Sequence, residues 1–108
     1  MSKWLLVVET NCADATREAE FHEWYNKTHL PDVLEVPGFT TANRYEKIDP
    51  SEGEAKFVAA YEIETDDIDG FMKAHNDNVA RKRAEGRFSE LLVVVSRRLY
   101  KQLASISR

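Results

Sequence analysis

A histidine and a tyrosine one helical turn apart are the residues of this chain best placed for acid–base chemistry. They are His29 and Tyr25, within the aromatic-rich stretch 21–39. A histidine has a reference pKa of about 6.5, so near neutral pH it can both accept and donate a proton. Residues four apart share one helix face, so His29 could act as a base while Tyr25 donates a hydrogen bond to a substrate oxygen. In the alternative, structural role, His29 bonds a backbone carbonyl and fixes the turn before Pro31.

Further side chains are candidates for contacts with a substrate: Trp24, Asn43, Tyr61, Phe71 and His75. Trp24 and Phe71 are expected to form the core or a cavity wall. Asn43 and Arg44 are neighbours in a predicted strand, so only one of them can face a cavity. We expect Asn43 to point inward with Phe39 and Tyr45, and to bond a carbonyl or enolate oxygen. The opposite register would make Arg44 an anion clamp.

The histidines do not have the spacing of a metal site. His22 and His29 lie seven residues apart, which is about 10 Å along a helix axis and too far to share one ion. His75 interrupts the apolar stripe of a predicted helix, so it is either a core residue or part of a cavity between helices and sheet. We therefore expect no metal and no cofactor.

The alternation of apolar and polar residues predicts the elements that position these side chains. Strands are expected over residues 3–11, 38–48, 56–64 and 90–103, and helices over 16–28 and from a cap at Asp66 to Gly86. Pro31 disfavours helical geometry at Leu30, so the first helix should end near His29, with a separate short helical piece over 32–36.

The resulting order, βαββαβ, is that of the ferredoxin-like α+β fold, in one domain over residues 1–108. Its four-stranded antiparallel sheet carries both helices on one face. The other face is also predicted to be apolar, from Leu5, Val7, Val58, Ala60 and the run 91–95. An uncovered apolar face of this size is unusual in a monomer. We therefore expect a homodimer in which two sheets pack face to face.

Composition and charge limit the classes of molecule that the protein is expected to bind. The 108 residues have a net charge of −4, which argues against general nucleic-acid binding. The apolar run Trp4–Val8 is too short for a signal-peptide core or a membrane span, so we expect a cytoplasmic protein without a membrane partner. The basic cluster 81–83 is expected to complement the dipole at a helix C-terminus. No Gly-rich phosphate loop or Ser-centred nucleophile elbow is present.

One motif resembles a known family. The pattern F-x-x-[WY]-[WY]-x-x-x-H-x-P is followed by Pro37-Gly38-Phe39 and Arg44-Tyr45-Glu46, and its own positions are Phe21, Trp24, Tyr25, His29 and Pro31. This resembles EthD-like proteins of the dimeric α+β barrel superfamily, over essentially the whole chain, and implies the same fold and dimer. The superfamily includes muconolactone isomerases, aromatic polyketide cyclases, antibiotic monooxygenases and haem-handling enzymes, so the fold alone selects no reaction.

Three functions follow as hypotheses. The first is a small cofactor-independent isomerase, cyclase or lyase that acts on a hydrophobic carbonyl or phenolic metabolite through His29, with Tyr25 and Asn43 polarising an oxygen. The alternative is a non-catalytic metabolite-binding or accessory protein. The third is a haem-binding monooxygenase, because haem-handling relatives ligate iron through a histidine on the second helix, here His75. Haem degraders also have a tryptophan in the third strand, where this chain has Phe57 and Tyr61, which disfavours the third hypothesis.

Overall fold

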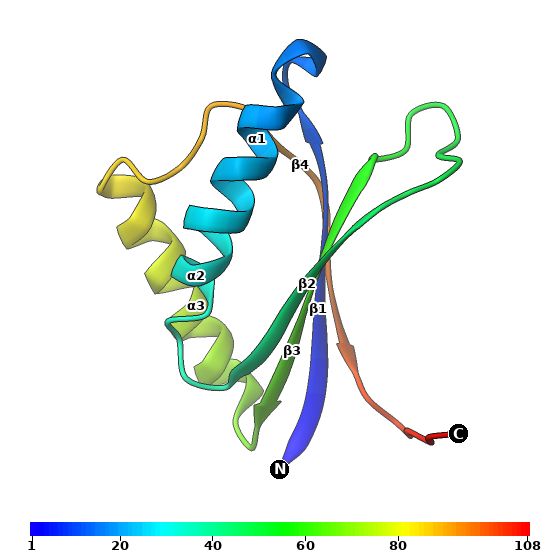
Figure 1. The fold of residues 1–108 in the computed structure, drawn as a ribbon. Helices are drawn as coiled ribbons and strands as arrows, with labels where there is room; N and C mark the ends of the chain where they lie inside the picture. Colours follow the sequence, from blue (N-terminus) through cyan, green and yellow to red (C-terminus); the bar gives the residue numbers. More distant parts are fainter.

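The fold is the predicted one: a four-stranded antiparallel sheet with its helices on one face (Figure 1). The computed structural model describes residues 1–108. The strands follow the order β2-β3-β1-β4. They are β1 (Ser2–Cys12), β2 (Phe39–Glu46), β3 (Phe57–Thr65) and β4 (Leu92–Lys101). None of the helices has the length and apolar character needed to cross a membrane.

The first helical segment does not end at His29 as predicted. After a short 3₁₀ turn (Ala15–Arg17), α1 (Glu18–Trp24) continues through a π-helical turn (Tyr25–His29) into α2 (Leu30–Val33). The N–H of Leu30 bonds the carbonyl of Tyr25, five residues earlier, and Leu30 keeps helical angles of −59° and −48°. Pro31 lacks an N–H, and its ring would clash with the carbonyl four residues before it in a regular helix. The wider turn lets the chain pass this proline without ending the helix.

The second long helix, α3 (Ile68–Ala84), is capped by Asp67 rather than by the predicted Asp66. The Asp67 carboxylate accepts a hydrogen bond from the Gly70 N–H at 3.0 Å. The acid one residue earlier instead lies 3.8 Å from the N-terminal amine. Gly86 follows the helix with φ of 76°, as its predicted role as a stop signal requires.

A β-bulge in β2 overturns the predicted orientation of Asn43. Phe39 pairs with Ile63 but Thr41 pairs with Glu62, so one extra residue is accommodated between them and the alternation of faces shifts. Phe39 packs under the helices, whereas beyond the bulge it is Arg44 that lies on the helix side, opposite the buried Ala59. Asn43 therefore lies on the helix-free face and is exposed.

A second bulge acts in the same way on β4. Thr10 pairs with Val94 and Glu9 with Ser96, so the extra residue is Val95. As a result Val94 and Arg97, three residues apart, both face the helices. Only part of the predicted apolar run 91–95 can therefore lie on the other face.

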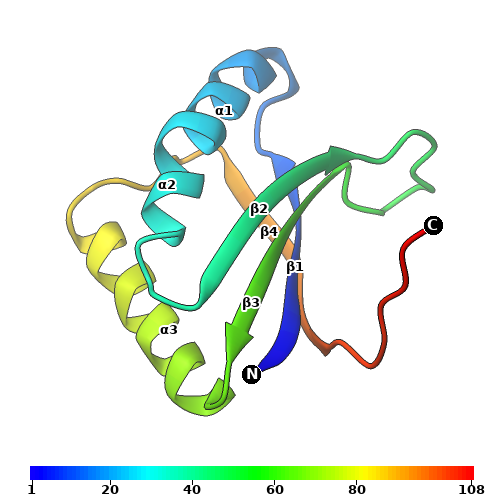
Figure 2. The ribbon, with the colours of Figure 1, turned by 60° about the horizontal axis from the view of Figure 1, so that its bottom comes forward.

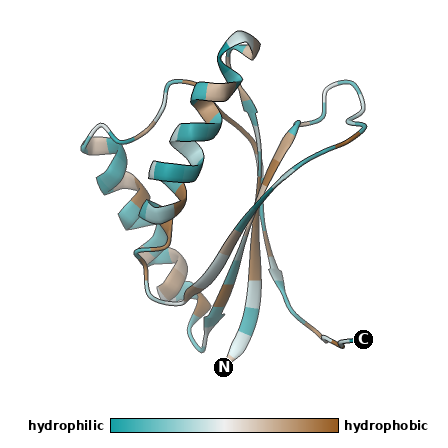
Figure 3. Ribbon diagram, in the orientation of Figure 1, coloured by the Kyte–Doolittle hydropathy of each residue, from teal (hydrophilic) through white to brown (hydrophobic).

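The helix-free face remains uncovered in the single chain (Figure 2). Its apolar residues include half-buried Leu5 and Val7 on β1 and Val58 and Ala60 on β3, and the exposed Arg98 and half-exposed Tyr100 of β4 lie beside them. Apolar segments run along the strands as well as along the helices (Figure 3).

Candidate functional site

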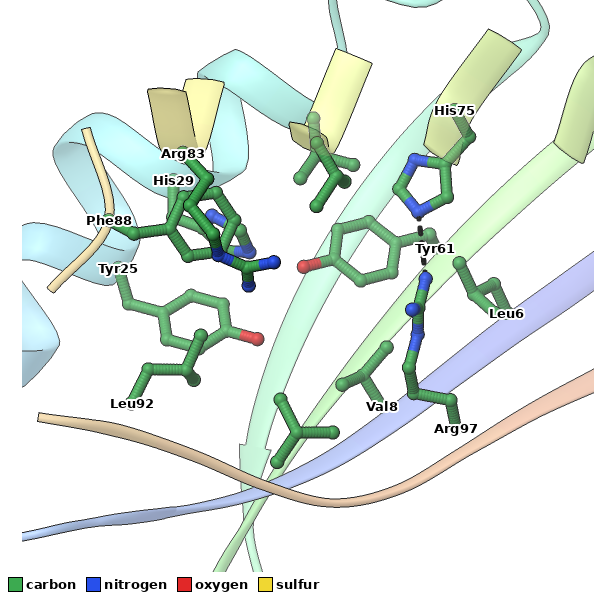
Figure 4. A pocket seen from close by; sticks show the side chains of 13 residues that line it. Leu6, Val8, Tyr25, His29, Tyr61, His75, Arg83, Phe88, Leu92 and Arg97 are labelled. Atoms are coloured by element: carbon green, nitrogen blue, oxygen red, sulfur yellow. Dashed lines mark hydrogen bonds between the residues drawn. The ribbon is translucent and has the colours of Figure 1, made fainter. Parts of the chain in front are cut away.

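A cavity of about 70 Å³ lies between the helices and the β1–β4 side of the sheet (Figure 4). Its walls are largely apolar and come from β1, β4, α2, α3 and the loop after α3. The apolar residues are Leu6, Val8, Val33, Val79, Phe88, Leu92 and Val94. Its polar side chains are pairs of tyrosines, histidines and arginines: Tyr25, Tyr61, His29, His75, Arg83 and Arg97. The arrangement is typical of a small-molecule site, in which a few polar groups converge on an apolar pocket.

The π-helical turn places Tyr25 and His29 side by side at this cavity, as the sequence predicts. Their rings meet edge to face with centroids 4.9 Å apart. The other side of the imidazole stacks on Trp24, with centroids 4.9 Å apart and planes 21° apart. The imidazole is thus held by aromatic contacts, and no hydrogen bond contributes to its pKa. The predicted structural role, in which His29 fixes the turn by bonding a carbonyl, is not what this geometry shows.

Both cavity histidines are uncharged at neutral pH. Burial lowers the pKa of His29 to about 4; the positive charges of Arg44 and Arg83 act in the same direction, and Asp32 opposes them. Burial, together with the charge of Arg97, lowers the pKa of His75 to about 4. A neutral imidazole offers one N–H donor and one acceptor nitrogen, so His29 can take up a proton but does not begin as an acid.

The two tyrosines supply hydroxyl donors. Both side chains are almost fully buried, and their hydroxyls point toward the same space (Figure 4). Burial raises the pKa of Tyr25, and burial together with the neighbouring Tyr25 raises that of Tyr61 well above its usual value. Both phenols therefore stay protonated and can donate hydrogen bonds to a ligand oxygen.

His75 is held by Arg97, which the sequence did not single out. Arg97 Nη2 lies 3.2 Å from His75 Nε2. A guanidinium can only donate, so Nε2 is the acceptor and the imidazole proton resides on Nδ1. That Nδ1 is buried and has no hydrogen-bond partner. His75 is thus neither a fully satisfied core histidine nor a free ligand.

Three predicted contact residues lie outside the cavity lining. Trp24 donates its indole N–H to the Arg87 carbonyl at 2.9 Å and supports His29 from behind. Phe71 packs in the core against Phe39, with ring centroids 4.8 Å apart. Asn43 is on the opposite face of the sheet for the reason given above. Of the predicted set, Tyr61 and His75 do line the cavity with Tyr25 and His29.

Arg44 lies on the helix side of the sheet but not in the cavity. Its guanidinium packs over the Tyr25 ring, 4.1 Å from the centroid, and donates a hydrogen bond to Asn26 at 3.0 Å. The observed register is thus the alternative one, in which Arg44 rather than Asn43 lies on the helix side. Its contact, however, is with the tyrosine ring rather than with the cavity itself.

An ion pair fixes the loop that carries Phe88. Arg87 bonds both carboxylate oxygens of Asp32, at 2.7 and 3.0 Å, and Asn78 bonds the Asp32 carbonyl at 2.9 Å. Asp32 is 6% exposed, and the guanidinium holds the pKa of its carboxyl below the usual value. These bonds join α2, α3 and the following loop, so that Phe88 packs edge-on against His29, with centroids 5.2 Å apart.

The cavity residues do not fit a haem. Neither nitrogen of His75, the histidine that would ligate iron, is free for it: Nε2 accepts a hydrogen bond from Arg97 and Nδ1 is buried. Clusters of three or more His, Cys, Asp or Glu side chains that could hold a metal ion are not found in the structure.

The fold and this cavity define a ferredoxin-like α+β protein with an internal tyrosine–histidine site. Residues 4–102 match the family model described as a domain of unknown function, DUF4286, and the chain belongs to that family. No curated protein sequence matches it.

Solved structures resemble the chain over nearly its full length. HapK from Hahella chejuensis has a TM-score of 0.73 at 13% identity, covering 97% of each chain. An EthD family protein from Bacillus halodurans has a TM-score of 0.58 at 22% identity, covering 95% of this chain and 100% of its own. SnoaB, a cofactor-independent oxygenase from Streptomyces nogalater, has a TM-score of 0.63 at 16% identity and covers 100% of both. The resemblance to EthD-like proteins is confirmed for the fold.

Proposed function

We propose that this protein is a small cofactor-independent enzyme that acts by acid–base chemistry on a hydrophobic carbonyl or phenolic metabolite. The observation that carries the proposal is His29: a neutral imidazole that lines an apolar cavity beside the hydroxyl-bearing rings of Tyr25 and Tyr61. SnoaB, which is described as a cofactor-independent oxygenase, indicates that this fold can support chemistry without a cofactor.

In the proposed reaction, His29 takes a proton from a carbon next to a carbonyl group, or from a phenol. The substrate oxygen gains negative charge as the proton leaves, and the phenols of Tyr25 and Tyr61 donate hydrogen bonds to it. The same negative charge raises the pKa of the nearby imidazole, so the imidazolium and the enolate or phenolate stabilise each other. Isomerisation, cyclisation and lyase reactions can each proceed from such an intermediate.

The reaction can be tested without knowing the natural substrate. In D₂O, a base in the cavity exchanges the acidic C–H protons of 2-tetralone for deuterium, which NMR spectroscopy follows directly. We expect exchange above the buffer rate by the natural protein, and a return to the buffer rate in His29→Gln with the fold preserved. Exchange at the natural rate in a folded His29→Gln protein would rule out His29 as the base.

One observation favours the second candidate, a non-catalytic metabolite-binding protein. A general base works best when its pKa lies near the operating pH, and the His29 pKa of about 4 is well below it. If the cavity only binds a metabolite, 2-tetralone is bound but not exchanged. A His29→Gln variant then changes affinity alone.

We also propose that the protein is a homodimer in which the helix-free sheet faces pack together. Val58, on the β3 part of that face, pairs with Glu9 and Tyr45 on its two neighbouring strands. A lysine there would bring two charges into the interface. Sedimentation velocity should therefore detect a dimer for the natural protein and a monomer for Val58→Lys, and a natural monomer would contradict the proposal.

A further inference from the structure

The cavity is cationic although the chain as a whole is acidic. Two arginines line it, and no aspartate or glutamate does. Two other basic side chains near this region are paired with carboxylates: Lys82 lies 2.9 Å from Glu35 and Arg87 lies 2.7 Å from Asp32. No carboxylate lies within ion-pair distance of Arg83 or Arg97; Arg83 instead packs on the Phe88 ring, and Arg97 contacts the neutral imidazole of His75.

Both guanidinium groups are held at the cavity by uncharged side chains. Arg83, in the last turn of α3, lies over the Phe88 ring with its central carbon 4.4 Å from the centroid. Figure 4 shows its guanidinium pointing toward the hydroxyls of Tyr25 and Tyr61. Arg97 enters from β4 beside His75. Such contacts orient each guanidinium while leaving its charge available to a ligand.

We propose that the metabolite bound here is an organic acid, with its apolar ring in the cavity and its carboxylate, or a comparable oxyanion, held by Arg83 and Arg97. The inference rests on the proposed function and names the substrate class for the same cavity. Guanidinium groups bind carboxylates with two parallel hydrogen bonds, and such charge-assisted bonds are stronger than those between neutral groups. The protonated phenols of Tyr25 and Tyr61 are further donors suited to an anion.

An acidic ligand should also raise the pKa of His29, the proposed base. Arg83 contributes to the low pKa of His29, and Arg97 to that of His75. A bound anion offsets these positive charges, so it raises the pKa of both imidazoles. His29 therefore becomes a stronger base when an acid occupies the cavity than when a neutral molecule does.

The test compares 2-naphthoate with its neutral amide, 2-naphthamide, by isothermal titration calorimetry at pH 7. The two probes have nearly the same shape and differ in charge. We expect the natural protein to bind naphthoate at least about tenfold more tightly than naphthamide, since one charged hydrogen-bonded contact is worth about that factor. Equal affinity for the two probes, or no binding of naphthoate, would overturn the proposal.

Variants locate the anion site. Arg83→Gln and Arg97→Gln should each weaken naphthoate binding about tenfold and leave naphthamide binding unchanged. Arg81→Gln is the matched control, because Arg81 is on the same helix but does not line the cavity, and it should bind like the natural protein. If Arg97→Gln fails to fold because the His75 contact is lost, Arg97→Lys replaces it. This variant keeps the positive charge and should retain the preference for naphthoate. Unchanged naphthoate affinity in both glutamine variants would overturn the assignment.

The role of His29 as the base and the binding of an organic acid are tested independently. His29→Gln should still prefer naphthoate, since the two arginines remain. If this variant also exchanges 2-tetralone protons at the natural rate, the proposed base is wrong while the acid site stands. If His29 is needed for exchange but the two probes bind equally, the base stands and the acid site is wrong.

Discussion

The guanidinium of Arg44 lies 4.1 Å from the centre of the Tyr25 ring, and no carboxylate neutralises it. It bonds only the Asn26 side chain, and it is also within 6 Å of the Phe21 and Phe57 rings. A cation over an aromatic face is attracted to the ring's electrons and favours the ionised phenol. Tyr25 is thus the cavity residue that this partly buried charge contacts directly.

Replacing Arg44 by Met should raise the pKa of Tyr25 above its already elevated value, because a positive charge that favours the phenolate is lost. It should also lower the free energy of unfolding by about 1 kcal/mol, the usual value of a partly buried cation–π contact. Carbon-13 NMR of the labelled tyrosine ring measures the pKa, and urea unfolding measures the stability. Arg44→Lys, which keeps the charge, is the control; an unchanged Tyr25 pKa in Arg44→Met would show that the guanidinium has no electrostatic effect on the phenol.

Replacing Asp32 by Asn should lower the unfolding temperature by about 5 °C or more, because the buried carboxylate bonds Arg87 at two oxygens and an amide cannot do so. Glu35→Gln is the matched control. It removes the ion pair with Lys82, whose glutamate is half-exposed, and should change the unfolding temperature by no more than a degree or two. Calorimetry compares the two variants, and equal effects would mean that the Asp32 pair is no more important than a surface pair.

Stability should fall as the pH is lowered from about 6.5 to 4. His29 and His75 have pKa values of about 4 in the folded protein and an ordinary value near 6.5 when unfolded, so the unfolded chain binds more protons in this range. Each histidine should contribute a loss on the order of 3 kcal/mol. Urea unfolding at pH 7 and pH 4.5 measures it, and the loss should shrink in His75→Gln. An identical pH dependence in that variant would mean that His75 titrates normally in the fold.

Gly38→Ala should be more destabilising than Gly53→Ala. Both glycines have positive φ, 115° and 84°, so an alanine at either position costs about 1–3 kcal/mol of backbone strain. At Gly38 the new methyl group would also lie 2.7 Å from the Phe71 ring, whereas nothing lies within 4 Å of it at Gly53. Urea unfolding of the two variants separates the packing cost from the strain. Equal losses would mean that Phe71 moves aside freely.

The fold was predictable because strands, helices and hairpin each leave a local pattern in the sequence. The alternation Phe57, Ala59, Tyr61, Ile63 in β3 has no irregularity, and all four are buried as expected. The bulges in β2 and β4 leave no such pattern, because one inserted residue looks like any other strand residue. For this reason the alternation predicts the wrong face for Asn43 and does not mark Arg97 as a cavity residue.

The candidate site was predictable where it depends on helical spacing. Tyr25 and His29 share a helix face in the α and π forms alike, so their pairing survived an error about where the helix ends. Arg83 was assigned only to the helix dipole, because its charge is typical of a last helical turn. Its contact with Phe88 depends on the loop that Arg87 fixes, fifty-five residues from Asp32 in the chain. Neither the Arg83–Phe88 contact nor the Arg87–Asp32 ion pair has a local sequence signal.

The π-helical turn also has a consequence for how the chain tolerates changes in length. A regular helix acquires such a turn when it holds one residue more than its hydrogen-bond ladder can accommodate. Lys27 points into solvent there and bonds only Glu23, so its side chain is dispensable, yet its backbone is the spacer between Tyr25 and His29. Exchanging Lys27 for another residue leaves the cavity intact, whereas deleting it makes the turn α-helical, and the Pro31 ring then clashes with the carbonyl four residues before it. At this position, homologous sequences should vary freely in residue type and hardly at all in residue count.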